Sequence, residues 1–203
     1  MTEEQRVLKA VSIESGLDLW AGEFGNDYLK RNQVDWRLRV PFWHSIIRDT
    51  GARSVFEMGA NAGWNLSAIR RGFPDVTVCG NDVNTLACAQ AQAAGLNVVN
   101  LLDFNAVFPG QFELVFTAGV LIHIEHEYLY EVMQALIAKS LRWVLAIEYE
   151  AASEQQVEYR GHTEKCWKRP YGMLYKGLGL TPVAAGDAGP GFDRCTYWLM
   201  EKR

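Results

Sequence analysis

The sequence has no pair of cysteines at the close spacing that zinc sites and redox motifs use. Neither a zinc site nor a disulfide framework is therefore expected, and no cluster of His, Asp or Glu predicts another metal site. Cysteines without such a pattern usually act as small, buried residues, and they are typical of proteins in the reducing cytoplasm. The four cysteines of the 203 residues are Cys79, Cys88, Cys166 and Cys195.

An excess of positive charge is also missing. The chain has 20 Lys and Arg against 24 Asp and Glu, a net charge of −4 at pH 7, and this disfavours nucleic acid as a partner. No apolar run reaches the length of about 18 residues that indicates a membrane helix, and residues 1–6 lack the basic start of a signal peptide. We therefore expect a cytoplasmic protein with no membrane span.

Strands alternate with helices from residue 53 onwards. This alternation predicts an α/β fold of the Rossmann-like kind, with a mostly parallel, doubly wound sheet and an antiparallel C-terminal strand. The strands are predicted at 53–58, 76–82, 97–101, 112–117, 143–149 and 194–201, and the helices at 63–71, 85–94, 127–139 and 171–178.

The first 50 residues differ from this pattern. Residues 1–20 and 35–49 are predicted to be helical, and Pro41 indicates either a kink or a helix start. We expect residues 1–50 to form a helical cap over the binding site. The core spans 51–203 within a single domain, and an insertion at 150–178 is expected to build the acceptor site.

A glycine turn follows the first predicted strand, in Glu57-Met58-Gly59-Ala60-Asn61-Ala62-Gly63. Gly59 and Gly63 let the backbone approach a ligand closely, and Glu57 can point a carboxylate across the turn. Asp82 ends the second strand 23 residues after Gly59. That spacing is close to the roughly 20 residues between a nucleotide-binding turn and the acid that binds ribose hydroxyls.

Two ligands are compatible with this turn, a dinucleotide and S-adenosylmethionine (SAM). The dinucleotide fingerprint is G-x-G-x-x-G, but Asn61 and Trp64 replace its second and third glycines. An acid before the turn suits a ligand with a cationic amino-acid end. Glu57-x-Gly59-x-x-x-Gly63 resembles the first motif of class I SAM-dependent methyltransferases, and a dehydrogenase is disfavoured.

A more specific resemblance extends over residues 20–170. The chain resembles the pseudaminic acid biosynthesis-associated methylases, small bacterial methyltransferase-like proteins found with nonulosonic-acid and surface-glycan pathways. The resemblance implies the methyltransferase fold and SAM as cofactor, and it connects the acceptor with carbohydrate. It is carried, in this order, by segments 23–32, 56–61, 119–124 and 148–149 and by Tyr159-Arg160-Gly161-His162.

The resemblance to class I methyltransferases also implies the rest of the cofactor site. In those enzymes, an acid after the third strand accepts a hydrogen bond from the adenine amino group of the cofactor. The residue next to that acid packs on the adenine ring. Asp103 and Phe104 stand at these positions, and Arg31 is expected to pair with the cofactor's carboxylate. The predicted cofactor residues are Tyr28, Arg31, Asn32, Glu57, Gly59, Ala60, Asn61, Gly63, Asn65, Asp82, Asp103, Phe104, Thr117 and Gly119.

Catalytic candidates lie after the fourth and fifth strands. His123 belongs to a segment that resembles the fourth methyltransferase motif, and its ordinary pKa near 6.5 suits a general base. A purely structural histidine is the alternative, since correct positioning can supply much of the rate. The catalytic candidates are His123, Glu148 and Tyr149, and the acceptor candidates, cations interleaved with aromatics, are Tyr159, Arg160, His162 and Lys165.

The sequence thus predicts a SAM-dependent methyltransferase. It would transfer a methyl group to oxygen or nitrogen of a small polar acceptor, such as a nonulosonic-acid-type sugar, a sugar nucleotide or a surface-glycan precursor. The alternatives are another small molecule, a peptide or a nucleic-acid base as acceptor, or a non-catalytic cofactor-binding partner subunit. The Asn/Asp-Pro-Pro-aromatic run of amino-methylating nucleic-acid enzymes is absent, since Thr117-Ala118-Gly119-Val120 occupies its position.

Overall fold

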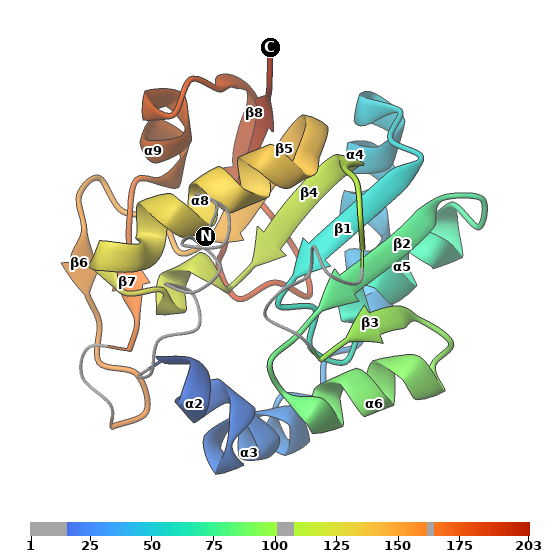
Figure 1. Cartoon of the computed structure of the whole chain (residues 1–203), viewed down its shortest axis with the longest axis vertical. Helices are drawn as coiled ribbons and strands as arrows, with labels where there is room; N and C mark the ends of the chain where they lie inside the picture. The colour runs from blue at the N-terminus through green and yellow to red at the C-terminus, as the bar shows by residue number, and fades with distance from the viewer. Residues whose placement is uncertain (1–15, 101–107, 162–164) are drawn as a thin grey trace.

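The computed structural model describes residues 16–100, 108–161 and 165–203 (Figure 1). Three of the predicted site residues, Asp103, Phe104 and His162, lie outside these ranges. No helix within the described ranges is both long enough and apolar enough to cross a membrane.

A seven-stranded sheet forms the centre of the molecule, in the order β3-β2-β1-β4-β5-β9-β8. Its first five strands are parallel, and β9 runs antiparallel to both β5 and β8. The predicted fold, a mostly parallel sheet with an antiparallel C-terminal strand, is therefore confirmed. The strands are β1 Ser54–Met58, β2 Thr77–Asn81, β3 Asn97–Val99, β4 Phe112–Ala118, β5 Ser140–Glu148, β8 Thr181–Asp187 and β9 Thr196–Glu201.

Strand β8 has no counterpart in the sequence prediction. Its residues, Thr-Pro-Val-Ala-Ala-Gly-Asp, include two β-branched side chains, but the Pro, Gly, Asp and two Ala among them do not indicate a strand. It forms because β9 provides a pairing partner, and it lies at the edge of the sheet, where Pro182 is tolerated.

Helices cover both faces of the sheet (Figure 1). Helices α4 Val40–Thr50, α5 Trp64–Gly72 and α6 Thr85–Ala93 pack on one face, around Trp43, Leu66 and Phe116. Helices α8 His126–Lys139 and α9 Tyr171–Gly177 pack on the other, around Met133 and Tyr171. Both faces of the central strands are thus apolar and buried, as a parallel sheet requires.

The N-terminal helices lie at the edge of the sheet where the parallel strands end (Figure 1). Helix α2 spans Gly16–Ala21 and α3 spans Glu23–Arg31. The side chain of Asn84 donates to Asn26 Oδ1 (2.8 Å) and to the backbone oxygen of Trp20 (3.1 Å), and so ties both helices to the start of α6. The turn η1, Trp36–Arg39, leads into α4, where Pro41 lies in the first turn and marks the helix start.

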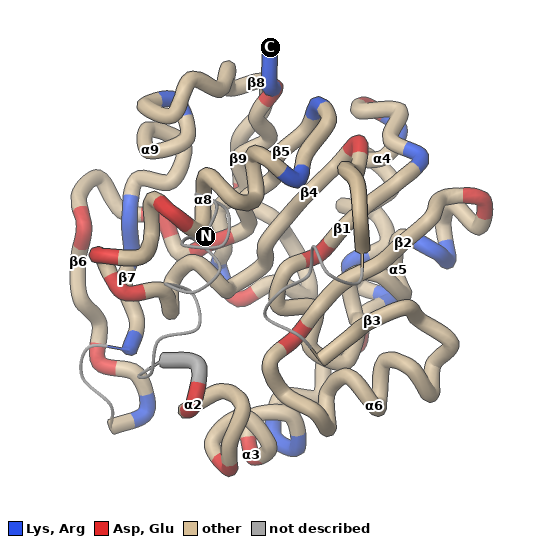
Figure 2. Tube along the Cα trace, viewed as in Figure 1, with Lys and Arg blue, Asp and Glu red and all other residues tan. Residues whose placement is uncertain are grey.

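The predicted insertion contains a short hairpin, β6 Gln155–Gln156 with β7 Trp167–Lys168. Charges of both signs are spread over the elements of the molecule, including this hairpin (Figure 2). The single turn η2, Leu121–His123, follows β4 and lies against β7. Together, η2, the hairpin and the N-terminal helices surround the strand ends that carry the predicted site.

Candidate functional site

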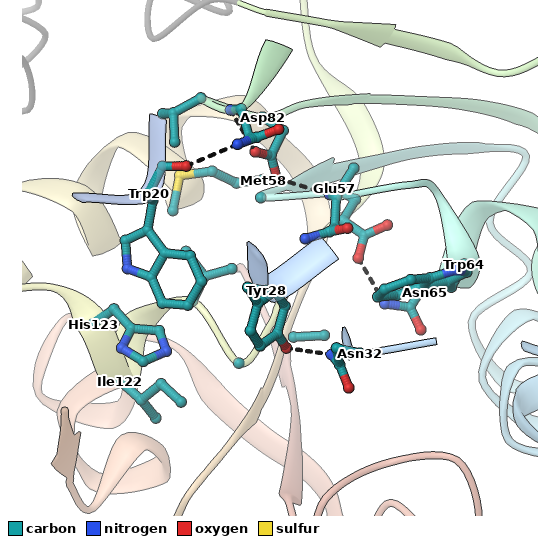
Figure 3. Close-up of a pocket in the computed structure, with 18 of the residues that line it drawn as sticks. Trp20, Tyr28, Asn32, Glu57, Met58, Trp64, Asn65, Asp82, Ile122 and His123 are labelled. Carbon is teal, nitrogen blue, oxygen red and sulfur yellow. Dashed lines mark hydrogen bonds between the residues drawn. The ribbon is translucent and has the colours of Figure 1, made fainter. Parts of the chain in front are cut away.

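A cavity of about 240 Å³ opens at the carboxyl ends of β1, β2, β4 and β5, beneath α2 and α3. Ligands of open α/β sheets bind at this edge. In Figure 3, Trp20 and His123 lie on one side of the cavity and Glu57 and Asn65 on the other, with Tyr28 between them. The predicted site residues that line it are Tyr28, Asn32, Glu57, Gly59, Ala60, Asn61, Asn65, Asp82, Gly119, His123, Tyr149 and Tyr159.

The glycine turn forms one wall of the cavity. Gly59 has φ +71°, and a Cβ atom there would lie 2.4 Å from Cγ2 of Val120. Gly63, at the start of α5, has φ +76°, and a Cβ there would lie 2.2 Å from Cδ1 of Leu96. Gly63 itself does not line the cavity. Both glycines are therefore required by backbone conformation and by close packing.

Glu57 is the most unusual group in the wall. Its side chain is 1% exposed, and Oε1 accepts a hydrogen bond from Nδ2 of Asn65 at 2.6 Å. Its other oxygen, Oε2, is buried and has no hydrogen-bond partner among the residues that the structure describes. Burial raises the pKa of Glu57 to about 8, against the opposing effects of Asn65 and Arg39. A buried carboxyl oxygen without a donor is costly, and a cationic ligand would satisfy it.

Arg39 reaches the same wall from the end of η1. Its Nη1 donates to Oδ1 of Asn65 at 2.9 Å, and its Nε donates to the backbone oxygen of Gly191 at 2.9 Å. The indole of Trp43 also donates to Asn65 Oδ1, at 3.1 Å. The side-chain amide of Asn65 therefore contacts the Glu57 carboxyl through its nitrogen and the Arg39 guanidinium through its oxygen.

Asp82 follows β2, as predicted, and its carboxylate holds the glycine turn. Oδ2 accepts from the backbone nitrogen of Asn61 at 2.7 Å, and Oδ1 accepts from that of Asn84 at 2.8 Å. Burial raises the pKa of Asp82, while these bonds oppose the shift. Each oxygen keeps a further lone pair that can accept from a ligand hydroxyl.

The residues of α3 divide between the cavity and its outside. Tyr28 and Asn32 line the cavity, and Asn32 Nδ2 donates to the Tyr28 hydroxyl at 2.5 Å. Arg31 is exposed and does not line it. Its guanidinium stacks on the outer aromatic rings, 5.1 Å from the Phe24 centroid and 5.6 Å from that of Tyr28.

His123 is a neutral imidazole in the cavity wall. Its Nδ1 lies 2.6 Å from the backbone oxygen of Lys165, so Nδ1 carries the proton and Nε2 is left with the lone pair. Burial lowers the pKa of His123 to about 4. Its ring packs between Trp20 and Tyr159, at centroid distances of 4.6 Å and 5.0 Å.

Glu148 ends β5 and lies beneath the η2 turn, outside the cavity lining. Its carboxylate accepts from the backbone nitrogens of Val120, Leu121 and Ile122, at 3.2–3.3 Å. Burial raises the pKa of Glu148 to about 7. Thr117 is likewise fully buried and does not line the cavity. The geometry thus gives Glu148 contact with the loop that carries His123, and none with the cavity.

The catalytic candidate Tyr149 and the predicted acceptor residues occupy two kinds of position. Tyr149 and Tyr159 line the cavity, and burial raises the pKa of both phenols. Arg160 is exposed outside it, with its guanidinium 5.9 Å from the Tyr159 ring. Lys165 also lies outside the lining and pairs with Glu125 at 3.3 Å.

Several lining residues have no signal in the sequence. Trp20 and Arg39 lie in the N-terminal helical region, far along the chain from the glycine turn, and the loop between β8 and β9 contributes Phe192 and Asp193. The guanidinium of Arg39 stacks 4.5 Å from the Phe192 ring. An amphipathic pattern identifies Trp20 and Arg39 only as helix residues, and the 191–195 loop has no motif. Within the described ranges, no three His, Cys, Asp or Glu side chains gather as metal ligands would.

The strand order and the reversed β9 define the Rossmann-like fold of class I methyltransferases. Solved structures match this fold. The sugar N-methyltransferase KedS8 from Streptoalloteichus sp ATCC 53650 has a TM-score of 0.66 at 14% identity, covering 90% of this chain and 94% of its own. Magnesium protoporphyrin IX methyltransferase from Synechocystis PCC 6803, with bound SAM, has a TM-score of 0.67 at 13% identity, covering 95% and 99%.

DesVI from Streptomyces venezuelae matches with a TM-score of 0.63 at 13% identity, covering 87% of this chain and 95% of its own. At these identities the likeness shows the fold. Several of the similar structures contain SAM or S-adenosylhomocysteine (SAH). No protein-family model and no curated protein matches the sequence, so the resemblance to the pseudaminic-acid-associated methylases stays a prediction.

Proposed function

We propose that this chain is a SAM-dependent methyltransferase that acts on a small polar acceptor, a sugar or sugar nucleotide, at oxygen or nitrogen. The observation that carries the proposal is the buried Oε2 of Glu57, which has no partner within the described ranges and lies beside a cavity at the strand ends. SAM has an ammonium group that can supply the missing donor. The bound SAM and SAH of structures with this fold support the same ligand.

Four groups of the chain would hold this cofactor. Glu57 would bind its ammonium group, and Arg39, rather than the exposed Arg31, would face its carboxylate. Asp82 would accept from its ribose hydroxyls with the lone pairs that the glycine turn leaves. Gly59, without a side chain, would let the ligand approach the backbone. Asp103 and Phe104 remain the predicted contacts of its adenine.

Bound SAM supplies a methyl group on a positively charged sulfur. The chain contributes positioning, because Trp20, Tyr28 and Tyr159 form a wall that can orient an acceptor and exclude water. His123 presents the lone pair of Nε2 and could receive a proton there. Glu148 acts through the backbone of residues 120–122, since it fixes the segment that carries His123.

The acceptor class is inferred from the walls and rim of the cavity. Sugar rings stack on aromatic faces such as those of Trp20 and Tyr159, whose ring centroids lie 6.4 Å apart. Arg31 and Arg160 stand outside these rings and could meet the phosphates of a sugar nucleotide. The fold shared with a sugar N-methyltransferase is in agreement with a carbohydrate acceptor.

Calorimetric titration with SAM and SAH, with NAD as control, tests the cofactor. We expect micromolar binding of SAM and SAH, no binding of NAD, and loss of binding in Asp82→Ala. Transfer is then tested with radiolabelled SAM and a panel of sugars and sugar nucleotides. No binding of SAM or SAH would refute the proposal, and binding without transfer to any acceptor would favour a non-catalytic partner subunit.

A further inference from the structure

Among the charged groups that line the described cavity, negative groups outnumber positive ones. In the part of the chain that the structure describes, four carboxyl groups and one guanidinium reach it, Glu57, Asp82, Glu125 and Asp193 with Arg39. His123 adds no charge, because burial lowers its pKa to about 4. Under the proposed function Glu57 and Asp82 hold the cofactor, so two acids remain beside the acceptor.

Asp193 is the better candidate of these two residues to bind a charged acceptor. Glu125 forms an ion pair with Nζ of Lys165 at 3.3 Å, which offsets its charge. In the described ranges Asp193 has no ion-pair partner, since Arg39 directs its Nε and Nη1 to Gly191 and Asn65. Asp193 lies in the 191–195 loop between β8 and β9, to which the proposed function gives no role.

Asp193 lines the same cavity as the aromatic side chains of Tyr28, Tyr149 and Tyr159. Burial, and then the charge of Asp193, raises the pKa of the Tyr149 phenol. The pKa of Tyr28 is raised by burial, by Tyr159 and by Asp193. The ring of Tyr28 in turn lies 5.2 Å from that of Trp20. One carboxylate, neutral phenols and aromatic faces therefore line the same cavity.

This combination selects for a cation. Aromatic faces attract ammonium groups through their quadrupole, and a carboxylate adds a direct ion pair. An anion at the same position would face Asp193 and Glu125, while Arg39, the one cation of the described lining, would face the carboxylate of the cofactor. The arginines that could attract anions, Arg31 and Arg160, stand outside the cavity.

We propose that the acceptor atom is an amine nitrogen, and that the acceptor enters as an ammonium ion held by Asp193 against Trp20, Tyr28 and Tyr159. This inference rests on the proposed function and narrows it from oxygen or nitrogen to nitrogen. The ammonium first releases one proton to solvent, which reaches the exposed Asp193. The nitrogen lone pair then bonds to the methyl carbon while the carbon–sulfur bond breaks. Its electron pair stays on sulfur, and the products are a methylated ammonium and SAH.

Three sugars that differ in charge test the inference by calorimetry on the SAH-bound chain. Glucosamine is cationic, glucose neutral and glucuronate anionic. We expect glucosamine to bind at least about tenfold tighter than glucose, and glucuronate not to bind. Equal binding of the three sugars, binding of none, or a preference for glucuronate would overturn the inference.

Substitutions at Asp193 assign the effect to that carboxylate. Asp193→Asn should bring the preference for glucosamine to within about twofold, and Asp193→Lys should shift it to glucuronate. Asp75→Asn, an exposed acid outside the cavity, should keep the wild-type preference. A preference that survives both changes at Asp193 would overturn the inference.

The affinity for SAH, measured first on every variant, separates the two proposals. A wild-type chain that does not bind SAH would refute the proposed function, and the inference with it. A chain that binds SAH normally but shows no preference among the sugars would refute only the amine acceptor.

Discussion

Glu57 and Glu148 are two carboxyl groups in nearly the same setting. Each ends or nearly ends a parallel strand, each is 1% exposed, and burial raises both pKa values, to about 8 and about 7. Their hydrogen bonds differ. In the described part of the chain, Glu57 has one side-chain donor, Asn65, and one oxygen without a partner, whereas Glu148 accepts from three backbone nitrogens of residues 120–122.

This difference separates binding from support. A carboxylate whose donors all come from the fold can stabilise a loop, but it has little capacity left for a ligand. A carboxyl with a buried, unsatisfied oxygen is costly to the free protein, and a ligand that supplies a donor removes that cost. Both glutamates stand at strand ends in the sequence, so this position predicts a role in the site equally well for each. Only the hydrogen-bond donors in the folded structure distinguish the two.

Between these two carboxyls, the largest expected effect comes from Glu57→Gln. The amide cannot compensate the charge of a buried ammonium group, and loss of one partner of such a pair costs about 3 kcal/mol. We expect SAM affinity to fall by about 100-fold, measured by calorimetry at pH 8. Unchanged affinity would contradict the assignment of Glu57 to the cofactor.

A matched control is available in Glu158, an exposed glutamate outside the cavity. Glu158→Gln removes the same charge without touching the wall, and it should keep wild-type affinity. An equal loss in this variant would mean that net charge, rather than the Glu57 carboxylate, determines binding.

The next largest effect should be on stability, from Glu148→Gln. The amide nitrogen would replace an oxygen that accepts from the η2 backbone, and at least one buried N–H would lose its acceptor. We expect the free energy of unfolding to fall by about 2 kcal/mol, measured with urea. SAM affinity should fall less than in Glu57→Gln, and the reverse order would invalidate the comparison.

The half of the site that contains Glu57 could be predicted from the sequence because its parts are close along the chain. Glu57, Gly59 and Asp82 belong to one β-α-β unit, whose strand, turn and second strand each have a recognisable pattern. The turn leaves little geometric freedom, so residue order almost determines which atoms meet. Glu57 and Asp82 both line the cavity, and their binding of a cofactor stays a prediction.

The acceptor half could not be predicted in this way, because distant segments build it. Arg31 and Arg39 are both arginines of the helical region, but only the cavity lining distinguishes them. Asp193 reaches the cavity through the β8–β9 loop, and β8 exists only through pairing with β9. Such contacts depend on tertiary packing, which overrides local propensity.

The affinity for SAM should fall by up to about tenfold for each pH unit below pH 8. The pKa of Glu57, about 8, lies above the ordinary 4.5. The free chain therefore gains stability from the protonated carboxyl below pH 4.5 and loses it as the pH rises through about 8. An ammonium ligand prefers the ionised form, so binding should release a proton at pH 7. Titrations in phosphate and Tris buffers measure this release, which Glu57→Gln should abolish.

The smallest expected effect comes from a change in a hydrogen-bond donor that Glu57 has and Glu148 lacks. Asn65→Ala removes the side-chain hydrogen bond that holds the pKa of Glu57 down, so the pKa should rise further by about one unit. SAM affinity should then fall several-fold at pH 7 and recover at higher pH, with the midpoint of the pH profile displaced upward. Glu148 has backbone donors that this change leaves in place. A profile displaced downward, or a loss of affinity that is equal at every pH, would mean that Asn65 acts on the ligand directly and not through Glu57.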